Sequence, residues 1–250
     1  MEKIEELQKM IDESSKIVFF GGAGVSTESG IPDFRSVDGL YNQKYDYPPE
    51  TILSHTFYMR KKGDFYKFYR EKILLEGSSL EPQPNSAHLK LAELEAAGKL
   101  TAVVTQNIDG LHQMAGSRTV YELHGTIMKN YCETCHKFFN LDYVKNNKDE
   151  RGVPCCDECG GDIKPDVVLY EEGLDGATLD GAIRAISEAD MLIIGGTSLV
   201  VYPAAGLIDY YRGNKLVLIN KSTTSADSRA NLVINDSIGK VFSQIQVKKP

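Results

Sequence analysis

The chain has 250 residues, of which 42% are hydrophobic and 25% charged, so it is long enough for one large domain or two with a substantial core. Its 28 basic and 35 acidic residues give a net charge of −7, which argues against nucleic acid or an acidic membrane as partner. No apolar run approaches the ~20 residues of a membrane span.

The first 15 residues are charged and amphipathic, with Ile4, Leu7 and Ile11 on one face. They predict a surface helix and not a signal peptide. Five cysteines in a chain without such a signal indicate a reducing compartment, so we expect a cytoplasmic protein. In that setting clustered thiols bind metal more often than they form disulfides.

A buried strand is predicted at 16–21, and a loop of small residues follows it from Gly22. In an α/β protein this is where exposed N–H groups and a helix N-terminus bind a pyrophosphate. The loop departs from the ordinary nicotinamide fingerprint, because Thr27 stands at its closing glycine position and no acidic residue ends a second strand about 20 positions on. The alternative for the glycine-rich loop is a tight turn without a ligand. The residues from Ile31 to Arg35 that follow it are not typical turn formers, so we take a dinucleotide site as the first hypothesis.

Residues 36–85 are rich in aromatic and charged side chains. Three of them follow helical spacing, namely Phe65, Phe68 and Tyr69. This pattern favours helices packed over the sheet, and a flexible cover over a ligand is the alternative. A clearly marked helix is predicted at 85–98, because Asn85 or Ser86 can cap its start and Gly98 can stop it.

Two further strands end in polar residues. The strand predicted at 100–105 is followed by the run from Gln106 to His112, and the strand at 119–123 leads into His124. Because open parallel sheets place ligands at the carboxyl ends of their strands, these side chains converge on the rim of the glycine loop. Each one alone is most simply a loop-capping group, whereas their convergence favours a functional site.

A four-thiolate zinc site is the strongest signal in the chain. Cys132-x2-Cys135 and Cys156-x2-Cys159 are separated by 20 residues, a spacing at which each turn offers two sulfurs. Cys155 is an ambiguous neighbour, but Cys156 preserves the two-residue spacing. Four thiolates leave no open position for water, so we expect a structural zinc whose binding supplies folding free energy. Residues 129–164 carry six basic and seven acidic residues, which argues against a nucleic-acid-binding ribbon.

The remaining elements are predicted from apolar runs. They are a strand at 165–170 where the sheet resumes, an acidic turn at 171–173, a helix at 179–189, a buried strand at 191–196, a second small-residue turn at 197–203, a strand at 215–219 ending at Asn220, a short strand at 232–234, and a tail at 244–250. Asn220 is suitably placed for a ribose hydroxyl.

Alternation of strands, turns and helices predicts an α/β fold, a Rossmann-like doubly wound parallel sheet with a smaller inserted zinc-binding module and a helical insertion. We expect the NAD-binding domain to comprise residues 1–37, 84–126 and 165–250. The helical insertion is expected at 38–83 and the zinc module at 127–164.

Taken together, these motifs resemble the sirtuins, the family of NAD-dependent protein lysine deacylases. The resemblance covers residues 15–240 and follows the family order. It rests on the runs 22–26, 30–35, 105–112, 123–125, 196–203 and 218–220 and on the two cysteine pairs. Each run alone is weak, but the set is highly specific.

The resemblance implies that NAD is a consumed cosubstrate. The residues implied in binding it are Ala23, Thr27, Phe34, Arg35, Gln106, Ile108, Asp109, His124, Thr197, Ser198, Asn220 and Ile238. The catalytic residues implied are His124, Asn107 and Asp109. The metal ligands are Cys132, Cys135, Cys156 and Cys159.

The resemblance also assigns a reaction. The acetyl-lysine oxygen captures the ribose C1′ as nicotinamide leaves, and His124 acts as general base on the ribose hydroxyls. Asn107 and Asp109 hold nicotinamide for departure, while Phe34 shields C1′ from its return. The products are nicotinamide, O-acetyl-ADP-ribose and the deacetylated protein. Mono-ADP-ribosyl transfer and a non-catalytic NAD or ADP-ribose reader are the alternatives.

Acetyl-lysine proteins or peptides are expected to bind as an added β-strand, with Val168 and Val201 lining the lysine tunnel. The chain departs from the family where Tyr170-Glu171-Glu172 replaces aromatic-Gly-Glu, and the two acidic side chains predict a preference for basic flanking residues. Family members that remove succinyl groups resemble one another in a Tyr-x-x-Arg pair. Here the run is Tyr66-Lys-Phe-Tyr69, with Arg70 one position late, so we expect acetyl and other uncharged acyl groups. Nothing in the sequence specifies an oligomeric state.

Overall fold

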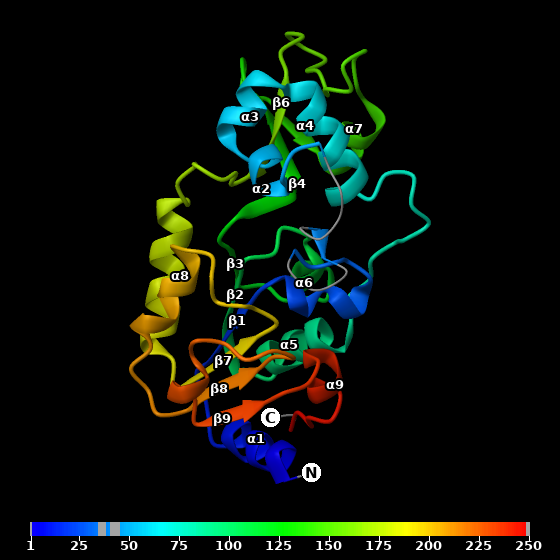
Figure 1. The fold of residues 1–250 in the computed structure, drawn as a ribbon. Coiled ribbons are helices and arrows are strands. Elements are labelled where there is room, and N and C mark those ends of the chain that lie inside the picture. The colour runs from blue at the N-terminus through cyan, green and yellow to red at the C-terminus, as the bar shows by residue number, and fades with distance from the viewer. Residues whose placement is uncertain (1, 35–38, 41–45, 249–250) are drawn as a thin grey trace.

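Six parallel strands form the main sheet in the order β3-β2-β1-β7-β8-β9 (Figure 1). Their bounds are β1 Ile17–Gly21, β2 Leu100–Thr105, β3 Val120–Glu122, β7 Met191–Gly195, β8 Leu216–Ile219 and β9 Leu232–Ile234. The structure, a computed structural model, describes residues 2–34, 39–40 and 46–248. The strand order reverses between β1 and β7, and doubly wound sheets bind ligands at such a switch point. The predicted fold class is therefore confirmed.

Both faces of this sheet are covered. Ile17 and Phe19 of β1 face one hydrophobic cluster, and Val18 and Phe20 face another. The first face is covered by α1 (Glu2–Asp12), α5 (Ser86–Ala96) and α9 (Ile238–Phe242), and the second by α8 (Gly176–Glu188) and the 3₁₀ helix η5 (Ala204–Tyr210) (Figure 1). Because both faces are buried, the central strands β1, β7 and β8 are continuous apolar runs, as is usual for parallel sheets.

Helix α5 anchors the glycine loop. Asn85 caps the helix, since its side chain accepts a hydrogen bond from the Ala87 N–H and its own N–H donates to Nδ1 of His88. The Asn85 amide also donates to the carbonyl oxygen of Val25 at 2.8 Å and to Oγ of Ser29 at 3.0 Å. These residues belong to the 3₁₀ turns η1 (Ala23–Val25) and η2 (Thr27–Ser29). The cap predicted for this helix therefore also fixes the loop after β1.

A second, antiparallel sheet of three strands has the order β5-β4-β6, with β4 Gly125–Cys132, β5 Phe138–Asn140 and β6 Ile163–Val167. The prediction that a strand at 165–170 resumes the main sheet is wrong, because β6 pairs with β4. Gly125 permits this pairing: it has φ +75°, and a Cβ there would lie 2.0 Å from the carbonyl oxygen of Asp166. Beyond β6, Tyr170 bridges to Ser54 instead.

The aromatic segment packs on this small sheet. Its helices are α2 (Pro49–Ile52), α3 (His55–Arg60), α4 (Lys62–Phe68) and the π-helix η4 (Tyr69–Ile73), and α7 (Leu141–Asn146) joins them (Figure 1). Tyr58, Phe65 and Tyr66 are fully buried in one cluster with Phe139 and Ile163. The prediction that these helices cover the main sheet is wrong, since the small sheet supplies their apolar partner.

Three smaller differences concern the start of α8, the helix α9 and the C-terminal stretch. Helix α8 begins at Gly176 and not at residue 179, because Asp175 caps it by accepting the Thr178 N–H at 2.8 Å. The stretch predicted as a C-terminal tail places Ile245 in the main core, and α9 before it was not predicted. The short helices α6 (Leu111–Met114) and η6 (Asp227–Arg229) complete the order.

No helix within 2–34, 39–40 or 46–248 is long and apolar enough to cross a membrane.

Two buried imidazoles lie beneath the glycine loop, and they make stability depend on pH. The ring centroids of His88 and His112 are 4.7 Å apart, and neither nitrogen of His112 has a partner among the described residues. Burial and the neighbouring His88 lower the pKa of His112 to about 3. In the unfolded chain His112 is protonated near pH 6.5, whereas in the folded chain it is protonated only near pH 3. The stability that the neutral, buried His112 contributes is therefore complete above pH 6.5 and is lost as the pH falls towards 3.

We therefore expect the free energy of unfolding to fall by about 1.4 kcal/mol per pH unit below pH 6.5 on account of His112. Urea titrations of the wild type and of His112→Phe between pH 7 and 4 measure this. The variant, which has no titrating group at this position, should show the shallower slope. Equal slopes in the two proteins would contradict the pKa assignment.

Candidate active site

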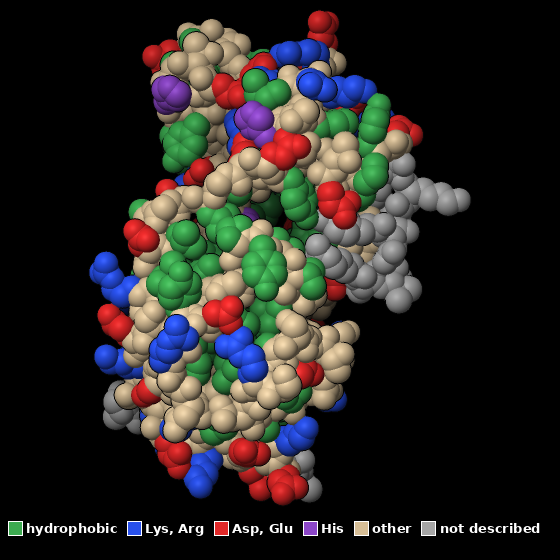
Figure 2. All heavy atoms as spheres, turned by 60° about the vertical axis from the view of Figure 1, so that its left-hand side comes forward, with side chains coloured by type: hydrophobic (Ala, Val, Ile, Leu, Met, Phe, Trp, Pro, Cys, Tyr) green, Lys and Arg blue, Asp and Glu red, His purple; other side chains and the backbone are tan. Residues whose placement is uncertain are grey.

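One continuous cleft of approximately 1660 Å³ runs along the carboxyl ends of the main sheet and up to the small sheet. Figure 2 shows hydrophobic side chains gathered around a hollow between the two parts of the molecule. The cleft is lined by every described residue predicted to bind NAD, by Asn107, and by Val168 and Val201. Arg35, the remaining predicted NAD residue, lies outside the described residues.

The loops after β1 and β7 are in direct backbone contact at the switch point. The Gly24 N–H donates to the carbonyl oxygen of Gly196 at 2.8 Å. A Cβ on Gly24 would lie 2.8 Å from that oxygen, and a Cβ on Gly22 would lie 2.9 Å from Cβ of Thr197. These glycines are thus required by close packing of the two loops, which leaves Ala23, Thr27 and Thr197 on the cleft wall.

Gly24→Ala should force the two loops apart, so we expect it to weaken NAD binding and to lower stability by about 1–3 kcal/mol, the usual cost of overpacking. Calorimetry with NAD and thermal denaturation measure the two effects. Gly176→Ala is the matched control, because no atom lies within 4 Å of a Cβ at that helix start. A Gly24→Ala protein that binds NAD as tightly as the control would refute the packing argument.

The hydroxyl of Ser26, in the loop after β1, connects two of the three predicted catalytic side chains. Ser26 Oγ donates to Oδ2 of Asp109 at 2.6 Å and accepts a hydrogen bond from Nδ2 of Asn107 at 3.0 Å. Asp109 also accepts the Leu111 N–H at 2.9 Å through Oδ1. Asn107 and Asp109 are therefore held in fixed orientations. Sequence reasoning missed this role of Ser26, since one small polar residue in a glycine-rich run carries no sign of its partners.

His124 is oriented by its neighbour on the adjoining strand end. Its Nδ1 lies 3.1 Å from the carbonyl oxygen of Gln106. A carbonyl oxygen only accepts hydrogen bonds, so Nδ1 carries the proton and Nε2 keeps its lone pair. Burial lowers the pKa of His124, against the opposing effect of the Gln106 carbonyl. The imidazole is thus neutral at pH 7 and suited to accept a proton in the cleft.

The far end of the cleft is formed by the loops after β7 and β8 and the start of α9. Gln106 Nε2 donates to Oγ1 of Thr197 at 3.1 Å, which ties the centre of the cleft to this end. Asn220 Nδ2 donates to the carbonyl oxygen of Ser222, so its Oδ1 is the group left to accept from a ligand. Ser198 and Ile238 also line the cleft here. These residues lie together as the sequence predicts.

The segment after β6 forms the opposite wall. The Val168 N–H donates to the carbonyl oxygen of His124 at 2.9 Å, so this segment is held beside the imidazole. Tyr170 exchanges backbone hydrogen bonds with Leu53 and His55. Glu171 adopts φ +76°, a conformation that favours glycine.

Both acidic side chains of this turn are engaged within the chain. Glu171 Oε2 accepts the Thr56 N–H at 2.9 Å. Glu172 accepts from Nδ1 of His55 at 2.9 Å, from the Leu169 N–H at 2.8 Å and from Nζ of Lys164 at 3.2 Å. The two carboxylates therefore hold the turn on α3, a role that the sequence did not indicate.

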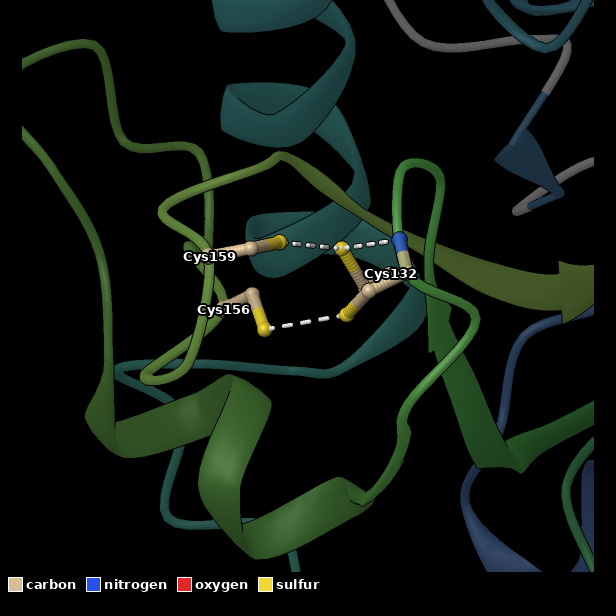
Figure 3. Close-up of side chains that lie close together, drawn as sticks. Cys132, Cys156 and Cys159 are labelled. Atoms are coloured by element: carbon tan, nitrogen blue, oxygen red, sulfur yellow. Dashed lines mark hydrogen bonds between the residues drawn. The ribbon is translucent and has the colours of Figure 1, made fainter.

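The four predicted cysteine ligands form one cluster. All four sulfur atoms lie within 4.8 Å of one another, with Cys132 and Cys159 3.4 Å apart and Cys135 and Cys156 3.6 Å apart. Figure 3 shows Cys156 and Cys159 facing Cys132 across the gap between their segments. Zn–S bonds of ≈ 2.3 Å in a tetrahedron put sulfurs about 3.8 Å apart, so the donor set fits zinc.

Backbone N–H groups support this fit. Thr134 and Cys135 donate to Sγ of Cys132 at 3.4 and 3.5 Å, and Glu158 donates to Sγ of Cys156 at 3.4 Å. Such bonds favour thiolates. Cys155 is outside the cluster, with its Sγ donating to the carbonyl oxygen of Val153 at 3.6 Å.

Known proteins share this arrangement. The sequence model of the Sir2 family matches residues 22–203. Over 247 residues the chain is 61% identical to a Clostridium acetobutylicum protein named NAD-dependent protein deacetylase, with 98% of each chain covered. A solved Sir2 complex with a deacetylated p53 peptide and 3′-O-acetyl ADP ribose matches with a TM-score of 0.88, 39% identity and 96% of each chain covered. A Sir2 complex with a p53 peptide and NAD⁺ matches with a TM-score of 0.85, 39% identity and the same coverage.

Proposed function

The chain belongs to the Sir2 family, and on that premise we propose how its residues carry out NAD-dependent protein deacetylation. The enzyme cleaves NAD, transfers the acetyl group of acetyl-lysine to ADP-ribose and releases nicotinamide and the deacetylated protein. NAD is therefore a consumed cosubstrate, and zinc is the structural metal. The observation that carries the proposal is a neutral His124, fixed through Nδ1 on Gln106, in the same cleft as the glycine loops.

NAD binding is proposed for the residues that the sequence singles out. Thr197, Ser198, Asn220 and Ile238 hold the adenosine half, because they line the end of the cleft after β7 and β8. The pyrophosphate lies on the glycine loop, near Ala23 and Thr27. Nicotinamide and its ribose lie among Phe34, Arg35, Gln106, Ile108 and Asp109. The support for this placement is the shared cleft and the switch point at β1 and β7.

The proposed chemistry begins at C1′ of the nicotinamide ribose. The acetyl oxygen of the substrate bonds to C1′ as the glycosidic bond breaks and nicotinamide leaves with the electron pair. Asn107 and Asp109, held by Ser26, orient the departing ring. Nε2 of His124 then takes a proton from the ribose hydroxyls, so that the 2′-oxygen attacks the imidate carbon, and water completes release of the amine.

The substrate is an acetyl-lysine protein or peptide, and we propose that it binds as an added strand between the segment at 168–172 and the loop at 199–203. Val168 and Val201 both line the cleft and would provide apolar walls for the lysine chain. The hydrogen bond from Val168 to His124 places this segment beside the base. Main-chain pairing supplies affinity without requiring a particular sequence.

The division of the chain remains as proposed from the sequence, with NAD bound by residues 1–37, 84–126 and 165–250, a helical insertion at 38–83 and a zinc module at 127–164. One refinement is that β6 belongs to the sheet of the zinc module. A cytoplasmic location also remains a prediction, and it rests on the reduced thiolates that the cysteine cluster requires.

Mass spectrometry of a reaction of purified enzyme, NAD and an acetylated peptide tests the function. We expect O-acetyl-ADP-ribose, nicotinamide and free peptide in equal amounts. With NAD labelled in its adenosine half, the label should appear in the small ester. Label retained on the protein would instead indicate mono-ADP-ribosyl transfer.

A further inference from the structure

One side chain of the glycine loop contacts the last helix of the chain. The N–H of Gly239, the second residue of α9, donates a hydrogen bond to Oε2 of Glu28 at 2.7 Å. Glu28 is the central residue of η2, so this bond joins two segments that lie 211 residues apart in the sequence. Neither residue is part of the cleft lining that the structure describes. An effect of Glu28 on a ligand in the cleft therefore passes through its neighbours in the chain.

The two segments are packed closely as well as hydrogen-bonded. A Cβ on Gly239 would lie 2.7 Å from Oε2 and 2.9 Å from both Cδ and Oε1 of Glu28. Gly239 is buried, and its φ is outside the left-handed region, so its backbone conformation does not require glycine. Within a helix glycine is less favourable than alanine. The contact with the Glu28 carboxylate accounts for a glycine at this position.

The hydrogen bond lies next to two residues that line the cleft. Thr27 precedes Glu28 in the glycine loop, and Ile238 precedes Gly239 at the start of α9. Both belong to the cleft wall, Thr27 on the loop proposed to hold the pyrophosphate and Ile238 at the adenosine end. Because each is bonded directly to one partner of the contact, the contact fixes the spacing between these two parts of the wall.

The other side of the same turn is held independently. The Asn85 amide donates to Oγ of Ser29 at 3.0 Å, which ties η2 to the start of α5. Helices α5 and α9 pack in one core, where Leu91 and Val241 belong to the same cluster. Removal of the Glu28 side chain should therefore release the turn from α9 and leave the fold intact.

The contact depends on a hydrogen-bond acceptor and not on an ion pair. Lys240, the next residue of α9, is paired with Asp236 at 2.6 Å. The partner of Glu28 is an uncharged backbone N–H. The amide oxygen of glutamine can accept the same bond. Glu28→Gln should therefore keep the contact, whereas Glu28→Ala should lose it.

We propose, on the basis of the deacetylase function, that Glu28 is a positioning residue for NAD. It holds η2 against the start of α9, so that Thr27 and Ile238 are placed for the pyrophosphate and the adenosine at the same time. Glu28 contacts neither NAD nor the reacting atoms. It therefore sets the affinity for NAD and leaves the chemistry at C1′ unchanged.

Calorimetry and steady-state kinetics on wild type, Glu28→Ala and Glu28→Gln test this role. Loss of the bond in Glu28→Ala should weaken NAD binding about three- to tenfold, the usual contribution of one hydrogen bond. KM for NAD should rise by the same factor, and kcat should stay close to wild type. The affinity for ADP-ribose, which lacks nicotinamide, should fall to the same extent. Glu28→Gln should bind both ligands as tightly as the wild type.

A double-mutant cycle with Gly239→Ala separates this contact from a general loss of packing. In the wild-type background the added Cβ displaces the Glu28 carboxylate, so Gly239→Ala should weaken NAD binding as Glu28→Ala does. In the Glu28→Ala background no carboxylate is present, so Gly239→Ala should cause no further loss. Gly176→Ala is the matched control, because a Cβ there meets no atom within 4 Å.

Wild-type NAD affinity in Glu28→Ala, additive losses in the double variant, or a fall in kcat with unchanged KM would each overturn the inference. Weak NAD binding by Glu28→Gln would do the same. The binding measurements need no turnover, which separates the two claims. A wild type that binds NAD but does not deacetylate an acetylated peptide would refute the deacetylase function, while the cycle would still decide the role of Glu28.

Discussion

His124→Ala is expected to lower kcat/KM for an acetylated peptide by about 10² to 10⁴, the usual contribution of a general base. The physical reason is that the imidazole is half-buried, neutral and fixed in one tautomer by Gln106, so Nε2 is free to accept a proton. NAD affinity should change much less, because the loops that hold the dinucleotide are built on Gly24 and Gly196. Steady-state kinetics and NAD calorimetry on the same protein measure both.

The pH profile gives the same prediction a second readout. Because burial lowers the pKa of His124, the acid limb of wild-type kcat/KM should have its midpoint below 6.5, and activity should fall as the pH falls through it. His136→Asn serves as control, since His136 is exposed at φ +61°, a conformation that asparagine tolerates. Wild-type turnover in His124→Ala would rule out the base assignment.

Cys156→Ser is expected to abolish zinc binding and to unfold the small sheet together with α3 and α4. Structural zinc sites contribute roughly 10 kcal/mol or more of apparent folding free energy, and Cys132 and Cys156 are themselves buried in the cluster that those helices share. Since the segment at 168–172 is joined to α3 through Glu171 and Glu172, loss of this part should also abolish turnover. Zinc content, circular dichroism and activity are the three measurements.

Cys155→Ser is the matched control for that experiment. Its sulfur lies outside the cluster and donates to the Val153 carbonyl oxygen at 3.6 Å, so zinc content and melting temperature should stay close to wild type. Removing zinc from the wild type with a chelator should reproduce the Cys156→Ser protein. Stoichiometric zinc in Cys156→Ser, or its loss in Cys155→Ser, would show that the ligand set is misassigned.

Much of the main sheet is predictable from sequence because its strands are buried on both faces. The run at 100–105 is mostly apolar between a glycine stop and a polar turn, and the structure has β2 at those residues. The zinc ligands are also predictable, because two Cys-x2-Cys pairs at this separation identify a four-thiolate metal site from the sequence alone. The polar residues after the strands follow from the topology, which brings the carboxyl ends of β1, β2 and β7 together.

The rest depends on contacts between distant segments. A short strand such as β6 does not reveal its sheet, and its pairing with β4 relies on the fit between Gly125 and Asp166. The helical spacing of the aromatic residues predicts helices, but it does not indicate which sheet these helices cover. The role of Ser26 could not be predicted either, because it depends on hydrogen bonds to Asn107 and Asp109, which are distant in the sequence.

In the proposed reaction the acyl oxygen of the substrate captures C1′ of the nicotinamide ribose inside this cleft. A peptide whose acetyl carbonyl carries ¹⁸O tests it most directly, with the products of a single rapid turnover analysed by mass spectrometry. We expect the label to stay on ADP-ribose after the acetyl ester is hydrolysed, because the amide oxygen has become bonded to C1′. Label recovered in acetate, with unlabelled ADP-ribose, would contradict it.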